Sequence, residues 1–136
     1  MSLRELELSG KVAVVTGAGR GIGRAIALAY AHAGAMVSCA ARTQAEIDDT
    51  VREIESFGGE GIAVRTDVTQ LASVQNLYRA TTQRFGGIDL LVVNAGASYD
   101  RRTIEESDVV PMAMFLATQP VMGPTGQSFS LMRRDL

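Results

Sequence analysis

The sequence has few of the features that mark secreted, membrane-spanning or nucleic-acid-binding proteins. It contains one cysteine, Cys39, which excludes an intramolecular disulfide and fits a reducing compartment. No apolar run approaches the ~18 residues that a membrane span needs. The formal net charge of −2 gives no reason to expect a nucleic acid or an anionic membrane as a partner. The first residues, MSLRELELSG, lack the apolar core of a signal peptide, so we expect a cytoplasmic protein.

Strand-like and helix-like segments alternate along the chain. Short apolar runs rich in β-branched residues alternate with segments whose apolar residues recur every three to four positions, as in an amphipathic helix. Thr43 is positioned to cap the second helix, and the apolar side of the third is predicted to carry Leu71, Val74, Leu77 and Tyr78. The predicted strands are residues 11–16, 36–40, 61–65 and 88–93, and the predicted helices are residues 24–33, 44–57 and 70–85.

The order of these segments predicts an α/β fold in a single domain over residues 1–136. Apolar residues make up 46% of the 136 residues, which is enough for one buried core. Alternating strands and helices, with near-continuous apolar strands, indicate a parallel sheet covered by helices on both faces. Right-handed crossovers then favour a doubly wound sheet in the order 3-2-1-4.

A glycine-rich stretch joins the first predicted strand to the first predicted helix, which is the context of a dinucleotide site. Gly17 allows a tight turn, Gly21 lets the backbone approach a pyrophosphate, and Gly23 allows close packing of helix on strand. The helix N-terminus adds free N–H groups and the positive end of a dipole. We therefore predict nucleotide binding here, with a merely structural turn as the alternative. The predicted contact residues of this stretch are Gly17, Gly19, Arg20, Gly21, Ile22 and Gly23.

Two further motifs follow the third and fourth predicted strands. Asp67-Val68 comes just after the third strand, and Asn94-Ala95-Gly96 follows the fourth. Together with the glycine stretch, in which three residues separate Gly17 from Gly21, they resemble the motifs of the short-chain dehydrogenase/reductase family over residues 7–108. The resemblance implies a Rossmann-like fold, an adenine contact at Asp67-Val68, and a cofactor beside the Asn94-Ala95-Gly96 motif.

Each of these motifs also has an ordinary structural interpretation. Taken alone, Asp67 fits a solvated turn residue or helix cap as well as it fits an adenine contact. Asn94 likewise fits a strand-end amide that bonds local backbone. The match at Asn94 is also incomplete, because Val93 stands where the family's signature has a first asparagine. In the family the second asparagine has both roles, since its amide stabilises the sheet beside the cofactor.

The end of the second predicted strand indicates which cofactor the site takes. NAD-selective sites usually place a carboxylate there, which bonds the ribose 2′-OH. Here Ala41 stands at that place, Arg42 follows it, and Arg20 lies within the glycine stretch. Two guanidinium groups favour a 2′-phosphate, and no Asp at the strand end repels it. We therefore predict NADP(H) in preference to NAD(H), with solvated arginines as the alternative.

The resemblance implies catalytic residues that this sequence does not contain. Family members use a Tyr as acid/base, a Lys four residues later that lowers the pKa of the tyrosine, and a Ser on the preceding strand. The only lysine here is Lys11, and the residue four positions after Tyr30, Tyr78 or Tyr99 is a glycine or a threonine. Tyr99 lies near the cofactor motif but has no activating group. No catalytic residue is assigned, and the 136-residue chain alone is expected to be inactive.

The residues after the fourth predicted strand resemble the end of the family's chain. Residues 109–118 resemble its final helix and residues 125–131 its last strand. Strands five and six and the catalytic helix are missing between them, so we expect a junction near residues 108–109. We expect a spatial gap at this junction, because a refolded deletion would leave the apolar fourth strand as an exposed edge; a refolded deletion is the alternative.

Two functions remain open from the sequence. The first is an NADP(H)-dependent carbonyl reductase or alcohol dehydrogenase, with a small-molecule carbonyl or alcohol as substrate and, as the family implies, a homo-oligomeric state. The second is a noncatalytic dinucleotide-binding fragment produced by internal deletion.

The remaining candidates have simple structural interpretations. His32 has no cysteine or acidic cluster at the spacing of metal ligands, so no metal site is predicted. Cys39 lies within a predicted strand and is expected to be inert packing. The pairs Arg101-Arg102 and Arg133-Arg134 are expected to be solvated charge.

Overall fold

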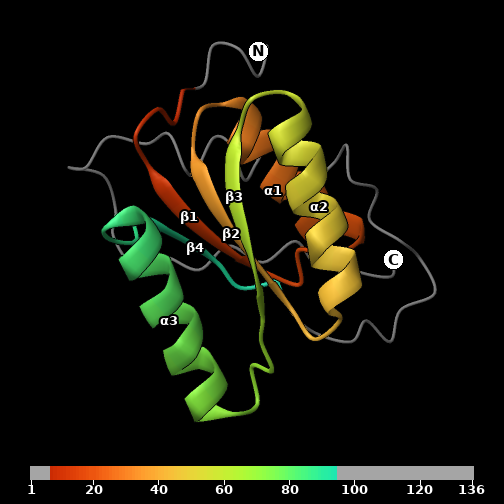
Figure 1. Cartoon of the computed structure of the whole chain (residues 1–136), viewed down its shortest axis with the longest axis vertical. Helices are drawn as coiled ribbons and strands as arrows, with labels where there is room; N and C mark the ends of the chain where they lie inside the picture. Colours follow the sequence, from red (N-terminus) through yellow and green to blue (C-terminus); the bar gives the residue numbers. More distant parts are fainter. Residues whose placement is uncertain (1–6, 95–136) are drawn as a thin grey trace, which may run out of the picture.

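The computed structural model describes residues 7–94, and within them it confirms the predicted parallel sheet in the order β3-β2-β1-β4 (Figure 1). The suspected junction, the expected final helix and last strand, and any further strands lie outside the described residues. The strands are β1 (Val12–Thr16), β2 (Met36–Ala41), β3 (Glu60–Arg65) and β4 (Leu90–Val92). The helices that connect them are α1 (Gly21–His32), α2 (Gln44–Ser56) and α3 (Leu71–Phe85).

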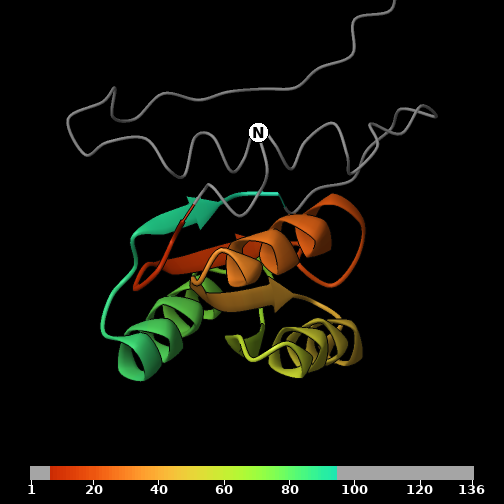
Figure 2. The same cartoon turned by 90° about the horizontal axis from the view of Figure 1, so that it is seen from above.

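Helices cover both faces of the sheet, as the alternation of strands and helices predicts. Helices α1 and α2 pack on one face, and α3 lies on the other, so α2 and α3 are on opposite sides in both views (Figure 1; Figure 2). Successive strand residues point to opposite faces. In β1, Val15 therefore packs with α1 and α2, whereas Val14 packs with Leu77 of α3. No helix in the described part of the chain is long and apolar enough to cross a membrane.

The ends of two helices differ from the sequence-based expectation. Helix α1 begins at Gly21 rather than at residue 24, so the last glycines of the loop form its first turn. Thr43 occupies the predicted N-cap position of α2, but its side chain makes no capping hydrogen bond. Its backbone carbonyl accepts from Glu46 N at 3.2 Å instead.

The predicted apolar side of α3 is wrong for three of its four residues. Leu77 is buried, but Leu71, Val74 and Tyr78 are 73%, 39% and 62% exposed. The line that contacts the sheet runs through Leu77 and Thr81, whose hydroxyl donates to Ser38 Oγ of β2 at 2.9 Å. The other three residues are turned to one side of that line by the 100° step of the helix. Periodicity therefore identified the helix but not the direction of its buried face.

Strand β4 presents apolar side chains on the same sheet face as α3. Leu91 is paired with Val14, which packs against α3, and it is 64% exposed. Val93, two residues further on, is 76% exposed. Within residues 7–94, β4 is an edge strand that pairs only with β1.

The buried thiol of Cys39 gives a prediction for chemical labelling. Cys39 is fully buried in β2, and this burial raises the pKa of its thiol to about 12. Because the thiolate is the reactive form, we expect no reaction with Ellman's reagent at pH 8 while the protein is folded, and complete reaction in guanidinium chloride. Labelling of the native protein at the rate of a free cysteine would show that β2 is not held in the core.

Candidate functional site

The glycine loop lies at the edge of the sheet where the strands have their carboxyl ends. Gly17 and Gly21 have φ values of +67° and +57°, the left-handed region that favours glycine. Ala18 N donates to Ala40 O at 3.2 Å, which ties the loop to β2. The first backbone bond of α1 runs from Arg24 N to Arg20 O at 3.3 Å. The preceding N–H groups of the first turn have no partner within the helix, and they make this end of α1 suited to an anion.

Gly23 lies where helix, loop and the end of β4 meet. A Cβ on Gly23 would lie 2.1 Å from Gly17 O and 2.5 Å from Asn94 Nδ2. A side chain therefore has no room at this position. The close approach brings three of the predicted contact residues, Gly17, Gly23 and Asn94, into one place.

Thr16 holds Asn94 at this junction. Asn94 N donates to Thr16 Oγ at 2.9 Å, and Thr16 Oγ donates to Val92 O at 3.3 Å. These two bonds fasten the end of β4 to the end of β1. The sequence analysis did not predict this positioning role for Thr16. The sequence feature that could have indicated it is the hydroxyl residue at the end of a strand, directly before Gly17. Ala95 and Gly96, the other predicted residues of this motif, lie outside the described residues.

Asp67 forms the turn that leads from β3 to α3. Its Oδ1 accepts from Thr69 Oγ at 2.7 Å and from Thr69 N at 3.0 Å, and its own N–H donates to Ser73 Oγ at 2.9 Å. The hydrogen bonds from Thr69, with a smaller contribution from the Arg42 charge, lower the pKa of the Asp67 carboxyl. Asp67 therefore has the turn role that is its ordinary structural interpretation, and the adenine contact stays a prediction. Val68 beside it is exposed.

The predicted arginines are exposed at this edge of the sheet. Arg20 is exposed at the start of α1, and Arg42 is exposed just after β2. Arg65 also comes to this place, because Ala41 and Arg65 are paired in the parallel register. Its Nε donates to Arg42 O at 3.2 Å. Sequence reasoning missed Arg65, although parallel strands that end together place such residues side by side.

Glu46, in the first turn of α2, packs directly on the glycine loop. A Cβ on Gly19 would lie 2.8 Å from Glu46 Cβ and 3.3 Å from Glu46 Oε2. One turn later, the buried Thr50 hydroxyl donates to Ala18 O at 2.9 Å and fixes α2 against the loop. Sequence reasoning also missed Glu46, because its contact with the glycine loop depends on how α2 packs against that loop.

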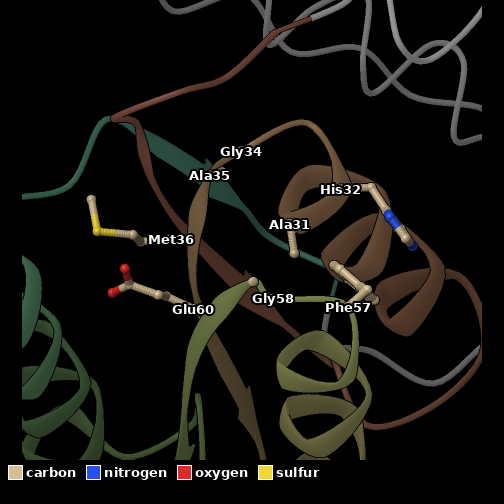
Figure 3. A pocket seen from close by; sticks show the side chains of 9 residues that line it. Ala31, His32, Gly34, Ala35, Met36, Phe57, Gly58 and Glu60 are labelled. Carbon is tan, nitrogen blue, oxygen red and sulfur yellow. The ribbon is translucent and has the colours of Figure 1, made fainter.

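A hollow lies at the edge of the sheet opposite to the glycine loop. It has a volume of about 220 Å³ and is formed by the ends of α1 and α2 and the starts of β2 and β3 (Figure 3). His32 stacks on Phe57 with ring centroids 3.6 Å apart, whereas Met36 and Glu60 point to the other side of the sheet. No three His, Cys, Asp or Glu side chains within residues 7–94 are grouped so that they could hold a metal ion.

The chain matches known proteins over most of its length. Residues 11–122 match the family model described as short chain dehydrogenase. An uncharacterized oxidoreductase of Methylorubrum extorquens is 42% identical over 135 residues, covering 92% of this chain and 54% of the relative. A short chain dehydrogenase/reductase of Aspergillus oryzae is 40% identical over 104 residues, covering 76% of this chain and 40% of the relative.

Solved structures agree with these matches in sequence and in fold. Hydroxysteroid dehydrogenase from Escherichia coli superposes with a TM-score of 0.67 at 38% identity, over 71% of this chain and 41% of that one. A short chain dehydrogenase/reductase from Burkholderia phymatum, solved in complex with NAD, gives 0.61 at 44% identity, over 62% of this chain and 30% of that one. The chain thus spans about half or less of the length of these relatives. With the sheet order and the family match in agreement, the chain belongs to the short-chain dehydrogenase/reductase family.

Proposed function

We propose that the glycine loop binds NADP(H), and that the complete protein is an NADP(H)-dependent oxidoreductase acting as a carbonyl reductase or alcohol dehydrogenase. The observation that carries this proposal is the geometry of the loop. Gly17 and Gly21 bend it with positive φ values, the first N–H groups of α1 point out of the helix end, and Gly23 leaves no room for a side chain against Gly17 O. Backbone and helix end together suit a pyrophosphate.

The arginines support NADP(H) as the preferred cofactor. Arg20 precedes the first residue of α1 and Arg42 follows the last residue of β2, and both side chains are exposed. In this type of site the adenosine ribose binds between the glycine loop and the end of the second strand. Ala41 offers no carboxylate to the ribose 2′-OH. The relative from Burkholderia phymatum was solved with NAD, so the preference for NADP(H) proposed here depends on these local side chains and not on the fold.

The described residues account for binding and orientation but not for proton transfer. When bound, the cofactor supplies the hydride. Thr16 fastens Asn94 at the end of β4, which fixes one wall of the site. Asp67 shapes the turn after β3, next to which an adenine would lie. No Tyr is followed at four residues by a Lys anywhere in the printed sequence.

That absence favours a second candidate function for the 136 residues as they stand. A noncatalytic dinucleotide-binding fragment would retain the loop, Arg42 and Asn94 but would lack turnover.

For the oxidoreductase, the substrate of the complete protein would be a small-molecule carbonyl or alcohol, and a homo-oligomer is the arrangement that the family implies.

Substitution of Arg42 tests the cofactor assignment. We expect Arg42→Ala to weaken NADPH binding by about 1.5–3 kcal/mol, the range for a hydrogen bond to a charged group, and to leave NADH binding little changed. Isothermal titration calorimetry with both cofactors measures the two changes. Arg79→Ala, which removes an exposed arginine from the middle of α3, is the matched control and should affect neither cofactor. Equal losses of affinity for NADPH and NADH would show that Arg42 does not bind the 2′-phosphate.

A further inference from the structure

The position of Glu46 places a negatively charged side chain against the glycine loop at Gly19. Its Cβ lies 2.8 Å from the point that a Cβ of Gly19 would occupy, and its Oε2 lies 3.3 Å from that same point. The carboxylate is therefore directed at the glycine loop. The half-buried side chain is held there because α2 is fastened to Ala18 O by the Thr50 hydroxyl.

No direct ion pair compensates this charge within residues 7–94. The salt bridges of the described chain join Arg24 to Asp49 and Glu53, and Arg52 to Asp49, so Glu46 takes part in none of them. Within the described residues, the Glu46 carboxylate is therefore not neutralised by an ion pair with Arg20 or Arg42.

We infer that Glu46 determines how strongly the site selects between the two cofactors, by repelling the 2′-phosphate that Arg20 and Arg42 attract. The inference rests on the proposed function. In a dinucleotide site of this architecture, the ribose 2′ position lies between the glycine loop and the end of the second strand. Helix α2 starts three residues after β2, and its first turn touches the loop at Gly19, so Glu46 borders that position. Both cofactors carry the pyrophosphate, so any repulsion between it and Glu46 is common to them, whereas only NADP(H) carries the 2′-phosphate and meets the additional repulsion.

A purely structural role for Glu46 makes a different prediction. An acidic residue in the first turn of a helix stabilises the helix through its dipole. Loss of that interaction would lower the stability of the fold without altering the ratio of NADPH to NADH affinity. The ratio therefore separates a role in selectivity from a role in helix stability.

The test is a titration of the 136-residue chain and of Glu46→Gln with NADPH and with NADH, each at low and at high salt. Glutamine preserves the packing on Gly19 and removes the charge. We expect Glu46→Gln to bind NADPH about fivefold to tenfold more tightly at low salt, and NADH within about twofold of the original chain. The two cofactors differ because only NADPH has the 2′-phosphate that the Glu46 carboxylate repels. The gain should shrink at high salt, because ions screen partly exposed charges.

The matched control is Glu55→Gln, which makes the same change of net charge near the far end of α2. It should leave both affinities unchanged. Glu46→Ala, which also keeps the Cβ that packs on Gly19, should change the ratio in the same direction as Glu46→Gln. No change in the ratio, equal changes for both cofactors, or weaker NADPH binding would overturn the role of Glu46 while leaving the proposed function in place. If neither the original chain nor the variants bound either cofactor, the proposed function would fail, and the inference with it.

Discussion

Gly23→Ala should be the most damaging single-methyl change in the described part of the chain. The added Cβ would lie 2.1 Å from Gly17 O and 2.5 Å from Asn94 Nδ2, and the nearer atom belongs to backbone that cannot swing aside. Overpacking of this kind costs about 1–3 kcal/mol, and we expect a loss of stability at the upper end of that range. We also expect the affinity for NADPH to fall by more than about tenfold, because any relief of the clash moves the loop or Asn94.

Urea denaturation and calorimetric titration measure the two effects, and Gly87→Ala is the control. A Cβ on Gly87 meets nothing within 4 Å, and its φ is not in the left-handed region, so the same added methyl should be neutral or slightly stabilising there. If Gly23→Ala and Gly87→Ala gave the same midpoint and the same affinity, the close approach of loop, helix and β4 would not exist in solution.

The 136-residue chain should not oxidise NADPH in the presence of ketone substrates. The sequence has Lys11 as its only lysine, and none of its three tyrosines has a lysine four residues later. General acid–base catalysis contributes about 10²–10⁴-fold to a rate, so its loss should bring turnover close to the background. Loss of absorbance at 340 nm measures the rate, and an intact family member such as the Escherichia coli hydroxysteroid dehydrogenase, assayed with its own substrate, is the positive control.

Activity above background would contradict this expectation, and Tyr99→Phe would then identify its source. Tyr99 follows the Asn94-Ala95-Gly96 motif and is the tyrosine nearest to it in sequence. If the short chain turned over and Tyr99→Phe abolished the turnover, Tyr99 would be an acid that the sequence pattern did not predict. If Tyr99→Phe left the activity unchanged, the protons would come from another group.

The strand order could be predicted because it depends on a regular alternation and on the handedness of crossovers. Short β-branched apolar runs such as residues 12–15, placed between helical segments, favour buried strands, and crossovers between parallel strands are right-handed in almost all proteins. The flank of α3 could not be predicted, because Leu71 and Tyr78 have helical spacing and their exposure depends on what lies beside the helix. Periodicity reports that a helix has an apolar side but does not report whether that side is covered.

The candidate site divides in a similar way. Gly17, Gly21 and Gly23 could be predicted because their roles follow from backbone geometry at a strand–helix turn. The contact between Glu46 and Gly19 could not be predicted from the sequence, since it depends on the angle at which α2 packs against the glycine loop. That angle is set by tertiary contacts such as the bond from Thr50 to Ala18 O.

Backbone NMR of the isotopically labelled chain during a titration with NADPH shows directly whether a dinucleotide binds at the glycine loop. We predict saturable shifts concentrated at residues 17–23, Arg42, Asp67-Val68 and Asn94, with little change around the His32–Phe57 hollow at the opposite edge of the sheet. Absence of saturable shifts would contradict a dinucleotide site at the glycine loop. Shifts concentrated at that hollow, or at the exposed α3 residues Leu71, Val74 and Tyr78, would contradict it as well.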